Sequence, residues 1–244
     1  MNIDNPYTII NETGSSDWLL ISEHAGKQVP EYLNNLGLPT YLFDEHIGHD
    51  IGAYEMTLAL SEKLDATAIV CNYSRLVIDC NRPLTDSSCM PAISDGIVIP
   101  ANTDLSTDDR LARINGIYQP FHSAVFQVLA DKLAHNPKTK IANIHSFTPM
   151  LAEEGKKRPW DIGFIYRNPS PSVKIMENLH RQTNHCIGDN QPYNGFIHKG
   201  YTIPAHSESQ EMQGFLVEFR QDLINTPIGI EYWSDTLINA ITDI

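Results

Sequence analysis

The chain has 244 residues, of which 41% are hydrophobic and 19% are charged, so it can bury one substantial core and is short for two. We therefore expect a single domain over residues 1–244. Seventeen basic residues stand against 30 acidic ones, and a net charge of −13 argues against nucleic-acid or anionic-membrane partners. The sequence has no leader-like start and no long apolar run, so we expect a cytoplasmic protein. Its four cysteines form no C-x-x-C pair, and we expect them to be reduced thiols. The sequence does not indicate an oligomeric state.

Apolar runs and helical spacing alternate along the chain. The runs predict strands at 18–22, 67–71, 76–78, 140–144, 162–166 and 215–219. Helical spacing predicts helices at 51–64, 107–134, 172–185 and 226–241. We expect a break in the second helix near Pro120, and a start to the last one at Thr226 as N-cap with Pro227 behind it. Strands alternating with helices favour an α/β fold, with helices on both faces of a parallel or mixed sheet.

Two longer polar segments interrupt this pattern, at 85–106 and 146–161. Both contain proline and glycine, and both follow a predicted strand. We interpret them as ordered functional loops or lids. Ligand sites in such folds lie beyond the carboxyl ends of the strands, which is where these loops begin.

The segment 73–83 places Arg75 and Arg82 seven positions apart and ends in Asn81-Arg82-Pro83. Arginine keeps its charge and its planar fork matches a carboxylate, so an arginine beside an asparagine suits a small acid. A chain this acidic has to concentrate positive charge locally to bind an anion. We expect a small anionic substrate to bind here.

Three histidine-bearing segments follow predicted strands or precede a helix. His24 and His145 each stand where an apolar run stops, and the segment 44–50 supplies further imidazoles and carboxylates, including Asp50. Zinc takes nitrogen and carboxylate ligands, and a catalytic site keeps one position open. The alternatives are buried, hydrogen-bonded core histidines and, for 44–50, a solvated helix start.

Glu218 lies inside the apolar run 215–219. Burying a carboxylate there is costly unless the group is paired or functional, so Glu218 is a candidate general base with a raised pKa. Alternation along a strand puts Arg220 on the same face, where an ion pair with Glu218 is the competing interpretation. Arg220 and Tyr193 are also candidate contacts for a substrate carboxylate.

Eight segments, taken in order, resemble the N-formylglutamate amidohydrolase family from about residue 17 to the end of the chain. They lie at 22–26, 46–52, 73–83, 144–149, 158–160, 192–195, 200–202 and 218–222. That family is similar to the zinc carboxypeptidases and to the aspartoacylase and succinylglutamate desuccinylase group. The resemblance implies a three-layer αβα sandwich around a central mixed sheet, of the phosphorylase/hydrolase type, and one zinc ion.

The resemblance also implies roles for individual residues. His24 and His145 match the two imidazole ligands, and Glu218 matches the base that activates water. The paired arginine that polarises the scissile carbonyl matches Arg75, and the carboxylate clamp matches Asn81 and Arg82.

The acidic metal ligand departs from the pattern. The wider group places it three residues after the first histidine, a position that is Lys27 in this chain. We assign Asp50 instead, because the amidohydrolase family has an acid at that helix start, and keep Glu23 and His46 as alternatives. Adjacent strand residues point to opposite faces, which disfavours Glu23 beside His24.

Three functional hypotheses follow. The first is a zinc amidohydrolase of a small N-acyl acidic amino acid such as N-formyl-L-glutamate. The second keeps this chemistry on a peptide C-terminus or another N-acyl amino acid, because the clamp recognises a carboxylate and not its carrier. The third is a non-catalytic module that binds acidic ligands.

Overall fold

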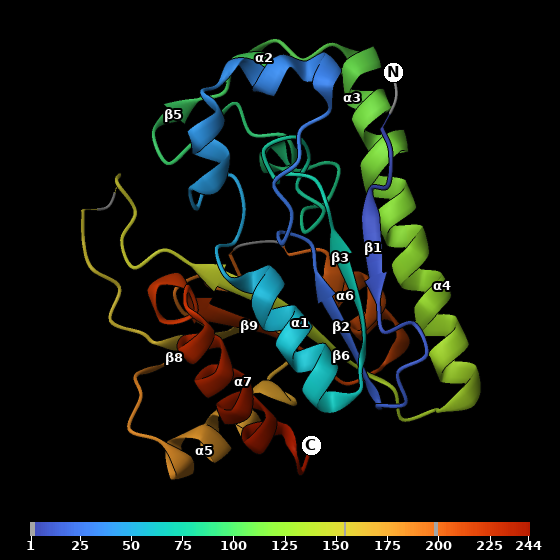
Figure 1. The fold of residues 1–244 in the computed structure, drawn as a ribbon, viewed down its shortest axis with the longest axis vertical. Coiled ribbons are helices and arrows are strands. Elements are labelled where there is room, and N and C mark those ends of the chain that lie inside the picture. Colours follow the sequence, from blue (N-terminus) through green and yellow to red (C-terminus); the bar gives the residue numbers. More distant parts are fainter. Residues whose placement is uncertain (1–2, 154, 198–199) are drawn as a thin grey trace.

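A mixed seven-stranded sheet forms the centre of the computed structural model, which describes residues 3–153, 155–197 and 200–244 (Figure 1). The strands lie in the order β1-β3-β2-β6-β9-β7-β8. Their bounds are β1 Tyr7–Ile10, β2 Trp18–Ser22, β3 Thr67–Cys71, β6 Lys140–Phe147, β7 Ile162–Ile165, β8 Ile187–Asp189 and β9 Gly214–Arg220. A separate hairpin joins β4 (Ile93–Ser94) to β5 (Ile97–Val98).

The four central strands run parallel to one another, and the group is bordered on each side by an antiparallel neighbour, β1 at one end and β7 at the other. β3, β2, β6 and β9 pair in parallel, whereas β1 is antiparallel to β3 and β7 is antiparallel to β9. The carboxyl ends of the four central strands therefore meet at one edge of the sheet. In the β6–β9 register His145 lies opposite Glu218, so two predicted site residues are neighbours across adjacent strands.

Helices cover both faces of the sheet, which gives the three layers that we predicted. The α-helices are α1 Ala53–Leu64, α2 Pro100–Thr103, α3 Thr107–Arg113, α4 Gln119–His135, α5 Ser172–Gln182, α6 Thr202–His206 and α7 Pro227–Ile241. Short 3-10 segments span Glu31–Gly37, Thr40–Asp44, Ser87–Cys89, Glu208–Gln210 and Gln221–Leu223. Helices α1, α5 and α7 pack together on one face, and α4 runs along the other (Figure 1).

Strand alternation divides the apolar residues between two cores. On β9, Phe215, Val217 and Phe219 belong to the core under α1, α5 and α7. Glu218 alternates with these residues and faces the opposite side of the sheet. The site therefore lies on the α4 face, at the carboxyl ends of the strands.

Most of the predicted elements are present with small changes at their ends. The predicted break near Pro120 is a π-helical turn, Ile114–Tyr118, between α3 and α4. Thr226 caps α7 by accepting a hydrogen bond from the Gly229 amide at 3.2 Å. The predicted strand at 76–78 was wrong, because this segment lies in a turn. Its apolar side chains are buried in the core, which explains why the sequence pattern resembled that of a strand. Short strands β1 and β8 were not predicted.

The two long polar segments touch each other. Asp95, in the first, accepts hydrogen bonds from the backbone amides of Ala152 and Glu153 in the second, at 2.9 and 3.1 Å. Residue 154 of the second loop lies outside the described residues, and a lid function for either loop stays a prediction. Among the described residues, no helix combines the length and apolar character needed to span a bilayer.

Candidate active site

The chain that follows β2 carries His24 to the edge of the sheet and fixes Asp50 beside it. The Asp50 amide donates to the His24 carbonyl at 2.9 Å. Two residues later Gly52 adopts a φ of +81°, and a Cβ there would lie 2.4 Å from the Ile224 carbonyl oxygen. Only glycine fits this close approach without strain, and the turn directs the Asp50 side chain inward.

Three side chains converge at this edge as a candidate metal site. His24, Asp50 and His145 each offer one ligand atom, and these atoms lie within 4.8 Å of one another. Asp50 Oδ2 is 2.8 Å from His145 Nδ1 and 3.5 Å from His24 Nδ1. All three residues are buried, so they do not form the solvated cluster that was the alternative interpretation for Asp50. They are the three ligands predicted from the sequence.

The far side of each imidazole contacts its own carboxylate. His24 Nε2 is 2.7 Å from Asp79 Oδ1, and His145 Nε2 is 3.0 Å from Glu23 Oε2. Such carboxylates fix the tautomer and ring orientation of metal-binding histidines. Glu23, an alternative ligand at the sequence level, thus lies behind His145, and His46 lies apart in a pair with Asp95 at 3.0 Å.

Charge and hydrogen bonding keep these acids ionised. Burial alone would raise the pKa of Asp50, but the charge of His24 and the hydrogen bond from His145 hold that pKa well below its usual value. Burial likewise opposes ionisation of Glu23, and the charge of His145 overcomes it to lower the pKa to about 2. The cluster therefore keeps anionic oxygen atoms ready for a cation.

The donor set fits a zinc ion. His24 Nδ1 is buried and has no hydrogen-bond partner among the described residues, although it faces Asp50. A buried nitrogen without a partner is costly unless another group binds it. Two imidazoles and one carboxylate are the ligands of a catalytic zinc site with an open position.

Arg75 links the candidate ligand Asp50 to Asp79, the carboxylate that contacts His24. Its Nη1 donates to Asp50 Oδ1 at 3.2 Å and its Nη2 to Asp79 Oδ2 at 3.1 Å. Burial opposes the charge, but these two carboxylates raise the pKa of Arg75 above its ordinary value. Arg75 is therefore a permanent cation at the wall of the site.

Glu218 differs from the other carboxyl groups of the site in having a pKa near neutral pH. Its burial raises the pKa to about 7, and its Oε2 has no hydrogen-bond partner within the described part of the chain. A carboxyl group with these properties can both accept and return a proton near neutral pH.

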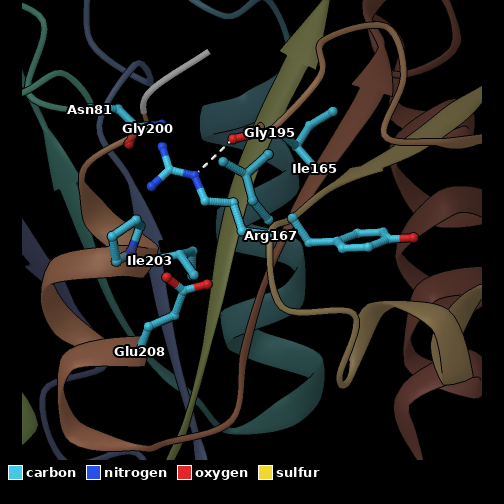
Figure 2. Close-up of a pocket in the computed structure, with 10 residues that line it drawn as sticks. Asn81, Ile165, Arg167, Gly195, Gly200, Ile203 and Glu208 are labelled. Atoms are coloured by element: carbon cyan, nitrogen blue, oxygen red, sulfur yellow. Dashed lines mark hydrogen bonds between the residues drawn. The ribbon is translucent and has the colours of Figure 1, made fainter. Parts of the chain in front are cut away.

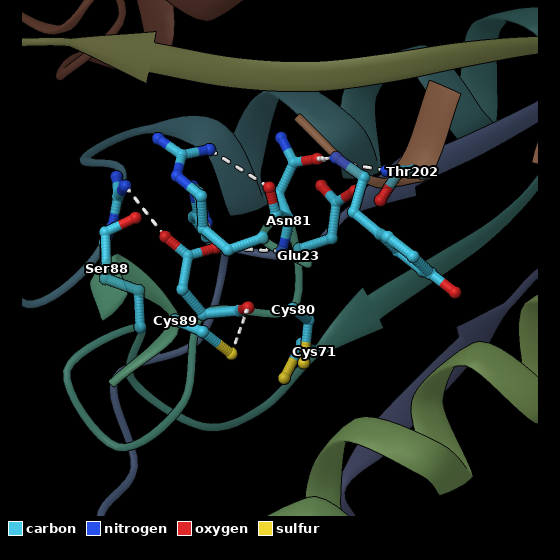
Figure 3. A network of polar contacts seen from close by, with 12 residues as sticks. Glu23, Cys71, Cys80, Asn81, Ser88, Cys89 and Thr202 are labelled. Atoms are coloured by element: carbon cyan, nitrogen blue, oxygen red, sulfur yellow. Dashed lines mark hydrogen bonds and ion pairs between the residues drawn. The ribbon is translucent and has the colours of Figure 1, made fainter. Parts of the chain in front are cut away.

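Asn81 and Arg82 follow at the mouth of the site. Asn81 Oδ1 accepts from the amides of Tyr201 and Thr202 at 2.9 and 3.1 Å, as Figure 3 shows for its contact toward Thr202. Asn81 therefore anchors the start of α6 and leaves its Nδ2, 3.4 Å from His145 Nε2, on the site side. Arg82 is half-buried and donates from Nη1 to the Asn81 carbonyl at 3.0 Å.

Tyr193 comes from the loop after β8 and packs against Arg158. The Arg158 guanidinium lies 5.1 Å from the Tyr193 ring centroid, and its Nη1 donates to the phenolic oxygen at 3.2 Å. Burial, then the nearby Glu218, raises the pKa of Tyr193. The hydroxyl group therefore stays protonated and can donate a hydrogen bond.

Arg220 is held away from these residues by two acids. Its Nη1 is 2.9 Å from Asp161 Oδ1 and its Nε is 2.7 Å from Asp222 Oδ1. This arrangement favours a structural role at the end of β9 over the predicted contact with substrate. The competing interpretation of an Arg220–Glu218 ion pair has no support in these contacts.

A cavity of about 270 Å³ lies beside the candidate metal ligands His24 and His145. Seven of the nine residues predicted as site residues line it, and Asp50 and Arg220 are the other two. The seven are His24, Arg75, Asn81, Arg82, His145, Tyr193 and Glu218. One small cavity thus contains two imidazoles, a carboxyl group with a pKa of about 7 and two arginines. This combination is suited to hydrolysis of a small acidic substrate.

Sequence reasoning missed the part played by Asp79 and Arg158. Asp79 lies in the segment 73–83 between Ile78 and Cys80, both of which are buried. A carboxylate between two apolar residues was the feature that could have identified it. Arg158 is itself buried, a costly place for a guanidinium group without partners. Asp79 contacts His24, 55 positions away, and Arg158 contacts Tyr193, 35 positions away, so local patterns could not identify these two pairings.

Comparison with known proteins agrees with this geometry. Residues 16–225 match the family model of N-formylglutamate amidohydrolase. The crystal structure of a gene product of Agrobacterium tumefaciens is 31% identical with a TM-score of 0.91, and the match covers 97% of this chain and 95% of that one.

A crystal structure of N-formylglutamate amidohydrolase from Ralstonia eutropha is 18% identical with a TM-score of 0.67, over 97% of this chain and 96% of that one. At this identity the likeness shows the fold. A search of curated sequences gives no significant match. The family match spans most of the chain and includes every residue of the candidate site, so the chain belongs to the N-formylglutamate amidohydrolase family.

Proposed function

We propose that this protein is a zinc-dependent amidohydrolase that cleaves the amide bond of a small N-acyl acidic amino acid such as N-formyl-L-glutamate. The observation that carries the proposal is the position of Glu218, which shares a cavity with His24 and lies opposite His145 on the next strand. Family membership supports amide hydrolysis. The cavity volume of about 270 Å³ supports a small substrate.

In this proposal His24, Asp50 and His145 hold the zinc ion. When bound, zinc supplies Lewis-acid chemistry, because it activates water and polarises a carbonyl group. Glu218 takes a proton from the attacking water and later returns it to the leaving amine, and its pKa of about 7 suits both transfers. Bond cleavage releases the acyl group as an acid and the amino acid as a free amine.

The arginines divide two further tasks. Arg75 has N–H groups beyond those directed at Asp50 and Asp79, and these meet the negative charge that develops on the carbonyl oxygen. Arg82 and the Asn81 amide group bind the α-carboxylate of the substrate. Tyr193 donates a hydrogen bond that orients the substrate.

Metal analysis combined with a substrate screen tests this function. We expect about one zinc ion per chain by the ligand count, and release of free amine from N-formylglutamate that stops on chelation and resumes with zinc. The screen includes N-acetylglutamate, N-succinylglutamate and dipeptides. Preference for dipeptides would indicate a carboxypeptidase, and a zinc-loaded protein that binds glutamate but hydrolyses none of them would indicate a binding module.

A further inference from the structure

We propose that Arg167 is a specificity-determining residue that binds the second, side-chain carboxylate of an acidic substrate. Arg167 follows β7 and has no part in the mechanism given above. The inference rests on the proposed function, because it takes the α-carboxylate to be held by Arg82. It adds the residue that distinguishes a substrate with an acidic side chain from one with a neutral side chain.

A second, smaller cavity adjoins the main one, and Arg167 is among the residues that line it (Figure 2). Its volume is about 40 Å³, enough for three or four water-sized groups at roughly 10–15 Å³ each. The two cavities share four wall residues, which makes the small one a side branch of the large one. The shared residues are Asn81, Ile165, Gly200 and Leu216.

The side branch has the chemical profile of a short acidic side chain. Ile165, Ile203 and Leu216 form apolar walls, which suit methylene groups. Arg167 supplies a cation in the wall, where it would meet the carboxylate of such a side chain. The space fits the three heavy atoms of a carboxylate group.

The Arg167 guanidinium group is oriented by one backbone contact. Its Nε donates to the Gly195 carbonyl at 2.8 Å, and Figure 2 shows the other end of the group directed toward Gly200 and Asn81. Among the described residues its two Nη atoms have no hydrogen-bond or ion-pair partner. A guanidinium fixed at Nε presents two parallel N–H groups, the geometry that binds a carboxylate in bidentate fashion.

Charge balance strengthens this assignment. The chain carries a net charge of −13, so a dicarboxylate needs a local cation for each of its carboxylates. Arg82 supplies one and Arg167 the other. Glu208 lines the same side branch and opposes an anionic ligand, and no ion pair joins it to Arg167 among the described residues. Removing the Glu208 charge should therefore strengthen dicarboxylate binding.

Paired substrates test the inference. N-formylglutamate and N-formylglutamine have the same shape and differ in the charge of the side chain, so the ratio of their kcat/KM values reports the contact with Arg167. In the zinc-loaded wild type we expect the acid to be preferred by about 10- to 100-fold, the worth of a hydrogen bond to a charged group. Arg167→Gln should abolish most of that preference, chiefly through a higher KM for N-formylglutamate.

Three variants serve as comparisons. Arg167→Lys keeps the charge without the fork and should retain part of the preference. Glu208→Gln should lower the KM for N-formylglutamate by about twofold to fivefold, in line with the small energies of charges that stay partly in contact with solvent. Arg181→Gln removes the same charge from α5, away from both cavities, and should leave the ratio as in the wild type.

The possible results separate this inference from the proposed function. If the wild type prefers N-formylglutamate and Arg167→Gln keeps that preference, Arg167 does not bind the side chain, and the proposed function stands. An equal loss on both substrates in Arg167→Gln would also overturn the inference, because it indicates a structural role. If the wild type hydrolyses neither substrate nor any other N-formyl amino acid, the proposed function fails and the inference fails with it.

Discussion

The two sides of the main cavity hold their polar side chains in different ways. On the metal side, His24, Asp50 and His145 are 3%, 4% and 1% exposed, and each contacts a further carboxylate or imidazole. On the side proposed to bind substrate, Arg82 is half-buried, and Arg167 in the adjoining side branch is exposed; both lie on loops. The candidate metal site is thus held by β6 and by buried turns at the edge of the sheet, whereas the proposed substrate contacts Arg82 and Arg167 come from loops.

On the proposed function, this difference allows substitutions in the loops to change the substrate that is bound while the geometry of the metal ligands stays the same. Metal ligands need their geometry held closely, which strand ends and buried hydrogen bonds provide. Substrate contacts on loops can be exchanged at small cost to the core. Substitutions on the two sides should therefore have separable effects, on metal binding and turnover on one side and on substrate preference on the other.

The largest effect should come from removing a ligand. His145→Ala should lower the zinc content to a small fraction per chain and reduce hydrolysis at least about 1,000-fold, because zinc chemistry contributes several kcal/mol. Metal analysis and the amine-release assay measure both. His180→Ala on the outer helix α5 is the matched control. Full zinc content and activity in His145→Ala would contradict the metal site.

A second effect concerns stability against pH in the metal-free protein. The pKa of Glu218 is raised from 4.5 to about 7, so between these values the native state binds more protons than the unfolded state, and this group lowers stability as pH rises. Glu218→Gln removes that dependence. Relative to wild type it should gain on the order of 2–3 kcal/mol between pH 4 and pH 8.

Urea unfolding of both proteins across this pH range measures the difference. The comparison between the two proteins cancels the contributions of the other titrating groups. A stability difference that does not change with pH would mean that Glu218 titrates normally.

A smaller effect should come from the carboxylate behind His24. Asp79→Asn keeps the shape but removes the charge that orients the imidazole, so zinc affinity should fall about 10- to 100-fold. Competition with a chelator of known affinity measures this loss. Asp131→Asn on the exposed face of α4 should leave zinc affinity unchanged. Equal affinities in wild type and Asp79→Asn would show that the pairing with His24 does not tune the metal.

The smallest effect should come from Arg220. Its contacts with Asp161 and Asp222 are partly buried ion pairs, so Arg220→Gln should cost about 1 kcal/mol of stability and leave the KM for N-formylglutamate nearly unchanged. Thermal unfolding and steady-state kinetics measure the two quantities. A tenfold higher KM with unchanged stability would restore Arg220 to the substrate side.

Local patterns in the sequence predicted the elements that depend on neighbouring residues. The cap at Thr226 and the apolar runs of β2, β3 and β9 are of this kind, since their side chains alone specify them. The turn at 76–78 misled the prediction, because its apolar residues are buried by tertiary packing and not by pairing in the sheet. Edge strands β1 and β8 have four and three residues, too few to give a periodic signal.

The candidate site divides in the same way. His24 and His145 were predicted because each interrupts an apolar run at a strand end. The contact of His24 with Asp79 joins residues 55 positions apart, and no local pattern reports it. Arg167 lies in a polar loop, where an arginine is ordinary, and its place in a side branch of the cavity depends on the path of several loops. Long-range pairings of this kind require the fold.

The measurement that tests the proposed function most directly is turnover of N-formylglutamate by zinc-loaded Glu218→Gln. Glutamine fills the same space and cannot take a proton from water. We expect kcat to fall about 100- to 10,000-fold, the usual contribution of a general base, while zinc content and substrate binding stay close to wild type. A zinc-loaded variant whose kcat stays within about tenfold of wild type, below that range, would contradict the role of Glu218 and the mechanism built on it.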